Sequence, residues 1–351
     1  MSSPLIPGFG FILIAAVAGG VFGLQYRVMR RYTVENTSLL SMFFATIVVP
    51  LIAAHFIIPG WTTAIADTSV KTHALVFVLG FGWGLGAITY AYGFNMIGIA
   101  LAAAMIKGIT IAIGSGVPLL RHWREVTGES KVVTILGIAV MLVGTAVCGK
   151  AGVMREKGLR LKDKNKDKES PDSAPAFRPT GKVFWLGMAC CLVSGVLSAC
   201  ANLGYEFADP LEKAMGGDLT WRATLVRWMP MYWGGIAALI IFMGGAMIKN
   251  GTWRNYFAKG SGRDLVIASS MGGVHFLAQI PYGVGAFYLG ALGTTVGWGV
   301  NIGMALVVAA SLGFLTGEWK GASKTSTRTI LGGIGVLLVA MVILAYANSL
   351  A

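Results

Sequence analysis

The sequence predicts an all-α polytopic membrane protein with ten transmembrane helices, arranged as two inverted five-helix repeats. Three observations support this class. Hydrophobic residues make up 55% of the 351 residues and charged residues only 12%, which is about half the charged fraction of a soluble domain. Apolar stretches of about 20 residues, the length of helix that spans a bilayer, recur along the chain. A charged connection divides these stretches into two sets of five.

The ten expected spans follow the apolar stretches in order. The first stretch has no basic segment before it and no clear small-residue cleavage site after it, so we expect a retained helix and not a signal peptide. Residues 1–150 form the first five-helix repeat, with spans expected at 5–25, 38–58, 74–97, 99–120 and 131–150. Residues 182–351 form the second, with spans expected at 182–205, 224–247, 265–289, 291–314 and 328–349. Residues 151–181 form a charged linker that contains prolines and lacks hydrophobic periodicity.

An odd number of spans in each half means that a repeat must be inverted across the membrane. A shift of 192 residues aligns the third span with the eighth, so that Tyr90 meets Tyr282 and Gly98 meets Gly290. Both glycines directly follow a span and mark a hairpin too short for an ordered loop. Inverted repeats are typical of secondary transporters, whose substrate site lies near the bilayer midplane between the repeats.

Glycines four residues apart predict close helix packing. A phosphate-binding glycine loop needs a strand before it and a helix opening after it, whereas these glycines lie within continuous apolar spans. Small residues at this spacing let helix backbones approach closely in lipid. The pairs are Gly80/Gly84 and Gly82/Gly86 in the third span, and Gly293/Gly297 and Gly299/Gly303 in the ninth.

The formal net charge of +13 raises the alternative of a nucleic-acid partner, because basic patches attract phosphates. The basic residues are instead spread over the connectors, with ten of them between Lys150 and Lys182. Connectors on the side of the linker carry 20 Lys and Arg, and those on the other side carry 7. The positive-inside rule therefore predicts a cytoplasmic linker and both termini outside, although short loops alone give 10 against 7. We expect a lipid bilayer and no nucleic acid as the partner.

The sequence offers no chemistry for an intramembrane enzyme. H-E-x-x-H and G-x-S-x-G motifs are absent, and the fifteen Asp and Glu lie in connectors or at the ends of spans. The four cysteines, Cys148, Cys190, Cys191 and Cys200, have neither metal-ligand nor disulfide spacing. We therefore expect no enzymatic activity, no catalytic residue, no metal and no cofactor. A membrane-embedded sensor or enzyme is the least favoured alternative.

Polar and aromatic side chains inside the spans indicate a substrate cavity. Ser194, Ser198 and Asn202 recur every four residues and so line one face of the sixth span. Buried polar groups in lipid face protein or a watery cavity. This set suits a neutral polyol, whose hydroxyls pair with amides and hydroxyls and whose C–H faces pack on aromatic rings. Hydrogen bonds between helices and simple aromatic packing are the alternatives. The other members of the expected site are Trp83, Tyr90, Gln279, Tyr282, Trp298 and Asn301.

Lys107 stands in the apolar fourth span, nine residues after Gly98 and therefore about 13 Å deep at 1.5 Å per residue. This is close to the midplane of a hydrocarbon layer about 30 Å thick, where a lysine costs about 2.5–3.5 kcal/mol. We expect Lys107 to face a cavity and to bind substrate or take part in coupling. Pairing with backbone carbonyls is the alternative. Proton coupling needs a group that changes charge, and the candidates are Glu206, His275, Glu35 and Lys107.

Several stretches resemble one known family. The segment GWGLGAITYAYGFNMIGIALAAAMIKGITIAIGSGVPLL (82–120) resembles the third and fourth helices of the bacterial L-rhamnose–proton symporter family. YTVENTSLLS (32–41) with Glu35, CLVSGVLSACAN (191–202), Gln279 and GEW (317–319) also match. Lys107 departs from the pattern, which has an apolar residue there. The resemblance covers most of the chain outside residues 151–181.

The resemblance implies a ten-helix member of the drug/metabolite transporter superfamily in the bacterial inner membrane, with both termini periplasmic. It implies a secondary active transporter that imports a neutral deoxysugar such as L-rhamnose with a proton, by alternating access. The alternatives are a carrier or exporter of another small metabolite, such as an anionic sugar. The expected partners are the sugar, a coupling proton and the lipid bilayer.

Overall fold

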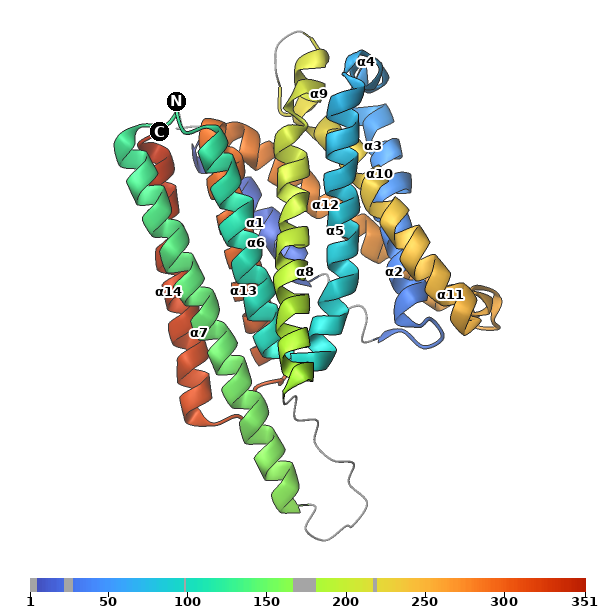
Figure 1. The fold of residues 1–351 in the computed structure, drawn as a ribbon, viewed down its shortest axis with the longest axis vertical. Coiled ribbons are helices and arrows are strands. Elements are labelled where there is room, and N and C mark those ends of the chain that lie inside the picture. Colours follow the sequence, from blue (N-terminus) through green and yellow to red (C-terminus); the bar gives the residue numbers. More distant parts are fainter. Residues whose placement is uncertain (1–4, 22–27, 98, 167–180, 217–219) are drawn as a thin grey trace.

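The computed structural model describes residues 5–21, 28–97, 99–166, 181–216 and 220–351. Within these ranges every regular element is a helix (Figure 1). Eight helical segments are long and apolar enough to cross a membrane, and the longest of them, Gly262–Leu315, contains two helices joined by a sharp turn. A shorter apolar helix, α1 (Leu5–Val21), precedes them. These findings confirm an all-helical polytopic membrane protein.

The first half of the chain follows the expected spans with shifted ends. The second span is α2 (Val34–Phe43), a π-helical turn (Phe44–Val48) and α3 (Val49–Ile57). The π turn ends two residues before Pro50. Proline has no N–H group, so it cannot donate a hydrogen bond to a carbonyl oxygen one turn earlier. The short α4 (Trp61–Asp67) leads to α5 (Val70–Ile97) and α6 (Ile99–Arg121). Residues 22–25 of the first expected span and Gly98 of the first predicted hairpin lie outside the described residues.

The helix α7 (Gly128–Lys166) is much longer than the expected span 131–150. Its 39 residues extend for about 58 Å at 1.5 Å per residue, against about 30 Å of hydrocarbon. The helix therefore continues past the bundle into the first part of the charged linker (Figure 1). Residues 167–180 of the linker lie outside the described residues.

The second half begins with α8 (Lys182–Phe207) and the short α9 (Asp209–Ala214). A 3₁₀ turn (Ala223–Arg227), α10 (Trp228–Leu239), a second π turn (Ile240–Gly244) and α11 (Gly245–Asn250) form one continuous segment. After a 3₁₀ turn (Thr252–Phe257), the chain continues through α12 (Gly262–Leu289), a turn at Gly290–Leu292, α13 (Gly293–Leu315) and α14 (Lys324–Ser349). Gly290 has φ 68°, a conformation that favours glycine, so the predicted hairpin at this position is confirmed.

Glycines bring α5 into close contact with two helices, as their spacing predicts. A Cβ at Gly80 would lie 1.9 Å from the carbonyl oxygen of Met231, and one at Gly84 would lie 2.6 Å from that of Gly235. On the other face, a Cβ at Gly86 would lie 3.0 Å from the backbone nitrogen of Ser198 in α8. No larger residue fits at Gly80 or Gly84 without separating α5 from α10.

The helices of the two halves are interleaved. In the first half α1 packs on α12 and α13, and in the second α8 packs on α5 and α6. Contacts also join α5 to α10, α12 to α2, α6 to α7, α13 to α14, α6 to α13, and α7 to α14. In Figure 1, α9, the start of α7 and the end of α14 lie at one end of the bundle, called here the α9 end. The end of α7 lies toward the opposite end, with α11 on the same side, and this is called the α11 end.

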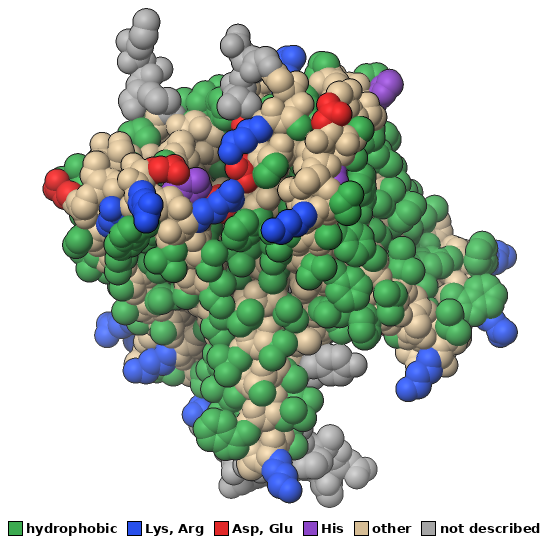
Figure 2. All heavy atoms as spheres, turned by 45° about the horizontal axis from the view of Figure 1, so that its top comes forward, with side chains coloured by type: hydrophobic (Ala, Val, Ile, Leu, Met, Phe, Trp, Pro, Cys, Tyr) green, Lys and Arg blue, Asp and Glu red, His purple; other side chains and the backbone are tan. Residues whose placement is uncertain are grey.

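Apolar side chains cover the flank of the bundle, whereas charged side chains gather at the α9 end, which is turned forward in Figure 2. Exposed residues along the helices include Val78, Ile135 and Val339. A soluble protein would bury such a surface, and lipid is the solvent that it fits.

Candidate functional site

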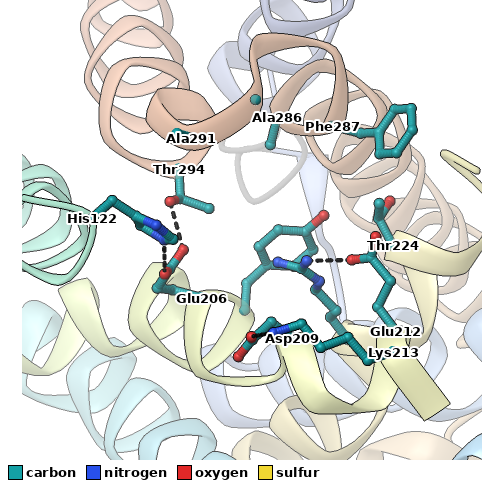
Figure 3. Close-up of a pocket in the computed structure, with 13 residues that line it drawn as sticks. His122, Glu206, Asp209, Glu212, Lys213, Thr224, Ala286, Phe287, Ala291 and Thr294 are labelled. Carbon is teal, nitrogen blue, oxygen red and sulfur yellow. Dashed lines mark hydrogen bonds and ion pairs between the residues drawn. The ribbon is translucent and has the colours of Figure 1, made fainter. Parts of the chain in front are cut away.

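A cavity of about 240 Å³ opens at the α9 end (Figure 3). Its walls come from the end of α8, from α9, from the 3₁₀ turn before α10, and from the hairpin between α12 and α13. We call it the charged cavity, because Glu206, Asp209, Glu212 and Arg227 line it. It joins segments that are far apart in the sequence.

Glu206 in the last turn of α8 is only 3% exposed and binds partners on two other elements. Its Oε1 accepts hydrogen bonds from Arg121 Nη1 at 2.9 Å and from His122 Nε2 at 2.8 Å. Its Oε2 accepts from Thr294 Oγ1 at 2.6 Å. Three donors therefore surround one buried carboxylate, which fits its ionised form. The contacts hold the end of α6 and the start of α13 to α8.

His122 lies between two carboxylates just beyond the end of α6. Its Nε2 faces Glu206, and its Nδ1 lies 2.8 Å from Glu125 Oε2. Only the protonated ring can donate from both nitrogens. Burial alone would lower the pKa of His122, but its hydrogen bonds to Glu125 and Glu206 and their negative charges outweigh burial, so the pKa lies above its ordinary value.

A buried ion pair forms the other wall of the charged cavity. Arg227 Nη2 binds Glu212 Oε2, and both side chains are largely buried. The Arg227 guanidinium also lies over the Tyr205 ring, 5.2 Å from its centroid. Asp209 at the cavity mouth binds Arg121 at 2.7 Å and Lys213 at 2.8 Å. Acidic and basic groups therefore balance within the cavity, which suits an uncharged ligand better than a strongly charged one.

Asn202, one turn before Glu206 on α8, joins four helices and is fully buried. Its Nδ2 donates to the carbonyl oxygen of Gly114 in α6 at 2.7 Å and to that of Thr294 in α13 at 2.9 Å. Its Oδ1 accepts from the hydroxyl of Tyr282 in α12. The predicted face of α8 is thus turned into the bundle, and this amide is already satisfied by protein.

The other predicted polar residues lie on α5, α8, α12 and α13 and have different partners. Ser194 Oγ donates to the Gly86 carbonyl at 3.0 Å. Trp298 Nε1 donates to the Thr110 carbonyl at 3.2 Å. Ser198, Gln279 and Asn301 are partly buried. Tyr90 lies in α5, but its side chain is outside the described residues.

Lys107 lies in α6 and is partly buried. It shares a helical face with Thr110 and Gly114, three and seven residues further on. That face meets Trp298 of α13, because a Cβ at Gly114 would lie 2.3 Å from Trp298 Nε1. Lys107 is therefore on the side of α6 that faces the bundle, and the described residues provide no hydrogen bond or ion pair for its ammonium.

A row of rings, called here the aromatic column, runs inward from the charged cavity. Tyr205 lines the cavity, and its centroid lies 4.6 Å from that of Trp228. Trp228 stacks on Tyr232 at 5.5 Å, Tyr232 lies 6.2 Å from Trp83, and Trp83 stacks on His275 at 6.0 Å. The column includes the predicted residues Trp83 and His275.

Glu35, the remaining coupling candidate, lies at the α11 end, away from the charged cavity. Its Oε1 accepts from Asn250 at 3.3 Å and from Thr252 at 3.1 Å. The neighbouring Asn36 donates to the Thr252 carbonyl at 3.0 Å. Asp264 at the start of α12 accepts from the backbone N–H groups of residues 30–32 at 2.5–3.0 Å. Amide and backbone hydrogen bonds therefore close this end.

The sequence distinguishes Glu206 as a coupling candidate but does not indicate the residues that contact it. The segments that contribute Arg121, His122, Glu212 and Arg227 are expected connectors or span ends, where charged residues are ordinary. The aromatic residues Tyr205, Trp228 and Tyr232 were not distinguished from packing residues. One usable signal is that acidic and basic residues lie close together between 205 and 227, whereas the connectors on the linker side are mainly basic.

A multi-pass helical bundle with buried ionisable groups around an internal cavity defines the class of the protein: it is a membrane transporter. The family model of the L-rhamnose-proton symport protein (RhaT) matches residues 1–251. The chain belongs to this family, whose members are transport proteins and not enzymes.

Curated relatives match over nearly the full length of the chain. It is 23% identical over 363 residues to the L-rhamnose-proton symporter of Pectobacterium carotovorum subsp. carotovorum (strain PC1), with 97% of each chain covered. It is 23% identical over 361 residues to that of Cronobacter sakazakii, again with 97% of each chain covered. The symporter of Escherichia coli (strain K12 / DH10B) is 21% identical over 360 residues, at the same coverage.

Proposed function

We propose that this chain is a secondary active transporter that imports a neutral sugar, L-rhamnose or a close relative, together with a proton, by alternating access. The similarity to named L-rhamnose-proton symporters over 97% of both chains carries this proposal. The balanced charges of the cavity, the aromatic column and the buried carboxylate of Glu206 support it.

The same proposal gives the bundle ten spans in two inverted repeats, 1–150 and 182–351, as in the drug/metabolite transporter superfamily. The ten spans include α1 and count α12 and α13 separately. The helix contacts of the two halves correspond. The packing of α8 against α5 and α6 corresponds to the packing of α1 against α12 and α13. In the same way, the contact between α5 and α10 corresponds to that between α12 and α2, and the contact between α6 and α7 corresponds to that between α13 and α14. A π turn interrupts the second span of each half.

We place the α9 end in the periplasm and the linker in the cytoplasm, with the protein in the bacterial inner membrane. The excess of Lys and Arg in the connectors on the linker side, 20 against 7, supports this orientation. The charged cavity then faces the side from which sugar is imported.

We place the substrate site one helical turn inward from the charged cavity, on the way to the midplane, where Asn202 joins α6, α12 and α13. Tyr282 and Trp298 contribute two neighbouring aromatic rings to this site. Their ring centroids lie 5.6 Å apart. Lys107 and Asn301 complete the polar lining from α6 and α13. An aromatic surface beside amide and ammonium groups is the chemistry that binds a monosaccharide.

Glu206 is the proposed proton-binding group. Protonation would remove the negative charge that holds Arg121 and His122, and would weaken both contacts. Because these contacts tie the end of α6 to α8, a proton on Glu206 favours opening of the α9 end. This coupling links proton binding to access from the periplasm. Glu35, His275 and Lys107 are the other candidates.

Uptake into proteoliposomes tests the function directly. Radiolabelled L-rhamnose should accumulate when the outer buffer is acidified, and a protonophore should abolish the accumulation. Glu206→Gln should lose gradient-driven accumulation but keep sugar exchange, whereas Glu125→Gln, which changes an exposed partner of His122, should keep both. Full accumulation by Glu206→Gln would exclude Glu206 as the proton carrier.

An anionic sugar is the second candidate substrate, because Lys107 presents an ammonium to the bundle interior without a partner among the described residues. Counterflow of L-rhamnose against unlabelled neutral sugars and sugar acids distinguishes the two. Competition by neutral deoxysugars alone supports the first proposal, and competition by sugar acids alone supports the second.

A further inference from the structure

Two polar side chains at the start of α10 are buried without a hydrogen-bond partner in the part of the chain that the structure describes. Trp228 is 2% exposed and Tyr232 is 0% exposed. Among the described residues, neither Trp228 Nε1 nor the Tyr232 hydroxyl has a partner. Buried donors without acceptors cost free energy, and native proteins rarely leave them so. These two groups therefore need an explanation.

Other polar groups in the same region are satisfied. Trp298 Nε1 donates to a carbonyl, the Tyr282 hydroxyl donates to Asn202, and both Asn202 amide hydrogens have acceptors. The comparable aromatic donors of Trp298 and Tyr282 are therefore paired. Among the described residues the hydroxyls of Ser115 and Thr295 are also buried without a partner, so what distinguishes the two α10 donors is their place beside the charged cavity.

The packing of α10 on α5 holds the two rings in place. A Cβ at Gly234 would lie 2.0 Å from the carbonyl oxygen of Phe77, so the two backbones are in direct contact. Trp228 and Tyr232 are one turn apart and stack with an interplanar angle of 16°. Tyr232 also lies against the Trp83 ring of α5, with centroids 6.2 Å apart, so this ring pair is packed within the contact between α10 and α5.

The two donors lie directly behind the charged cavity. Tyr205 forms the cavity wall and contacts Trp228 on its inner side. The Tyr205 hydroxyl donates to the Gly283 carbonyl at 3.4 Å, a long and therefore weak hydrogen bond. Arg227, which precedes Trp228 and lines the cavity, also has an Nε without a partner among the described residues. Displacement of the Tyr205 ring would connect the cavity with Trp228 and, through the stacked pair, with Tyr232.

We propose that Trp228 and Tyr232 bind the transported sugar, donating hydrogen bonds to its hydroxyl oxygens after the Tyr205 ring is displaced. The stacked rings offer faces for the C–H side of a pyranose, and the unpaired donors select a ligand rich in oxygen acceptors. A site built to hydrogen-bond a substrate leaves its polar groups unpaired when the substrate is absent. This inference rests on the proposed function and adds α10 to the site predicted on α5, α6, α8, α12 and α13.

Tyr232→Phe tests the proposal, because it removes only the unpaired hydroxyl. In the ligand-free protein its melting temperature should equal or exceed that of the wild type, since no hydrogen bond is lost. Its affinity for L-rhamnose should fall by about two- to tenfold, the effect of one hydrogen bond. Tyr282→Phe is the matched control: it removes a hydroxyl bonded to Asn202, so its ligand-free melting temperature should fall.

Thermal unfolding in detergent gives the melting temperatures, and calorimetric titration of the same samples with L-rhamnose gives the affinities. An unchanged affinity in Tyr232→Phe overturns the proposal. A ligand-free melting temperature as low as that of Tyr282→Phe also overturns it, because the hydroxyl would then have a structural partner. If the wild-type protein binds no sugar in a panel of neutral sugars, the proposed function fails and this inference with it.

Discussion

Substitution of Asn202 by Ala removes the amide that joins α8 to three other helices. Three hydrogen bonds are lost, two to the carbonyls of Gly114 and Thr294 and one from Tyr282. Interhelical hydrogen bonds in membrane proteins contribute about 0.6 kcal/mol on average and up to about 1.7 kcal/mol, so three give about 2–5 kcal/mol. Folded proteins are stable by about 5–15 kcal/mol. The variant should therefore fold, with much reduced stability.

Unfolding in mixed micelles, followed by circular dichroism, measures this loss. Ser194→Ala is the matched control on the same face of α8, because it removes a single hydrogen bond, to the Gly86 carbonyl. We expect its loss of stability to be about one third of that of Asn202→Ala. Titration with L-rhamnose should show severely weakened binding by Asn202→Ala, because the helices of the proposed substrate site are no longer held in register.

Two results would refute this reasoning. If Asn202→Ala loses no more stability than Ser194→Ala, the three contacts do not hold the bundle together. If its affinity for the sugar equals that of the wild type, Asn202 does not belong to the substrate site, either directly or through the helices that it joins.

Three further predictions concern single positions. The pKa of His122 is raised, so its contact with Glu206 stabilises the fold fully below pH 6.5 and less as the pH rises through the raised value. The melting temperature of His122→Asn should therefore lie below that of the wild type at acidic pH and converge with it at alkaline pH. A difference that stays constant with pH would contradict this. Lys107→Met should alter sugar affinity or the pH dependence of uptake without lowering stability, and wild-type transport would make Lys107 a structural residue. Gly234→Ala should reduce the free energy of unfolding by about 1–3 kcal/mol, because its Cβ would overlap the Phe77 carbonyl; an unchanged unfolding midpoint would argue against this close contact.

The fold class could be predicted because lipid imposes a simple rule on the sequence. Each span must be apolar over its whole length, so composition alone locates the helices to within a few residues. The glycines of α5 were informative for a similar reason, since only close packing explains small residues four apart in a span. The continuation of α7 to Lys166 could not be predicted this way, because a helix in water carries no apolar signal.

The charged cavity could be predicted only in part. Glu206 stood out as a carboxylate at the edge of an apolar span, but Arg121, His122 and Arg227 come from other segments. Their contacts depend on how α6, α8 and α10 pack, and no local pattern encodes that packing. The Trp228 and Tyr232 rings look like ordinary apolar packing in the sequence. They are distinguished only in the structure, where their polar atoms have no partner among the described residues.

The two ends of the bundle are closed by different interactions, and this difference has a kinetic consequence. Arg121 and Asp209, which help to close the α9 end, are partly exposed, so dissolved salt screens their attraction. At the α11 end the hydrogen bonds of Asn36 are between neutral groups. The carboxylates of Glu35 and Asp264 accept there from neutral side chains and backbone N–H groups, so these contacts are less sensitive to salt. Under the proposed alternating access, raising ionic strength on the periplasmic face should speed the outward-opening step, and the same salt inside should leave the inward-opening step almost unchanged. Transport would thus be asymmetric in its response to salt, even though the helix contacts of the two proposed repeats correspond.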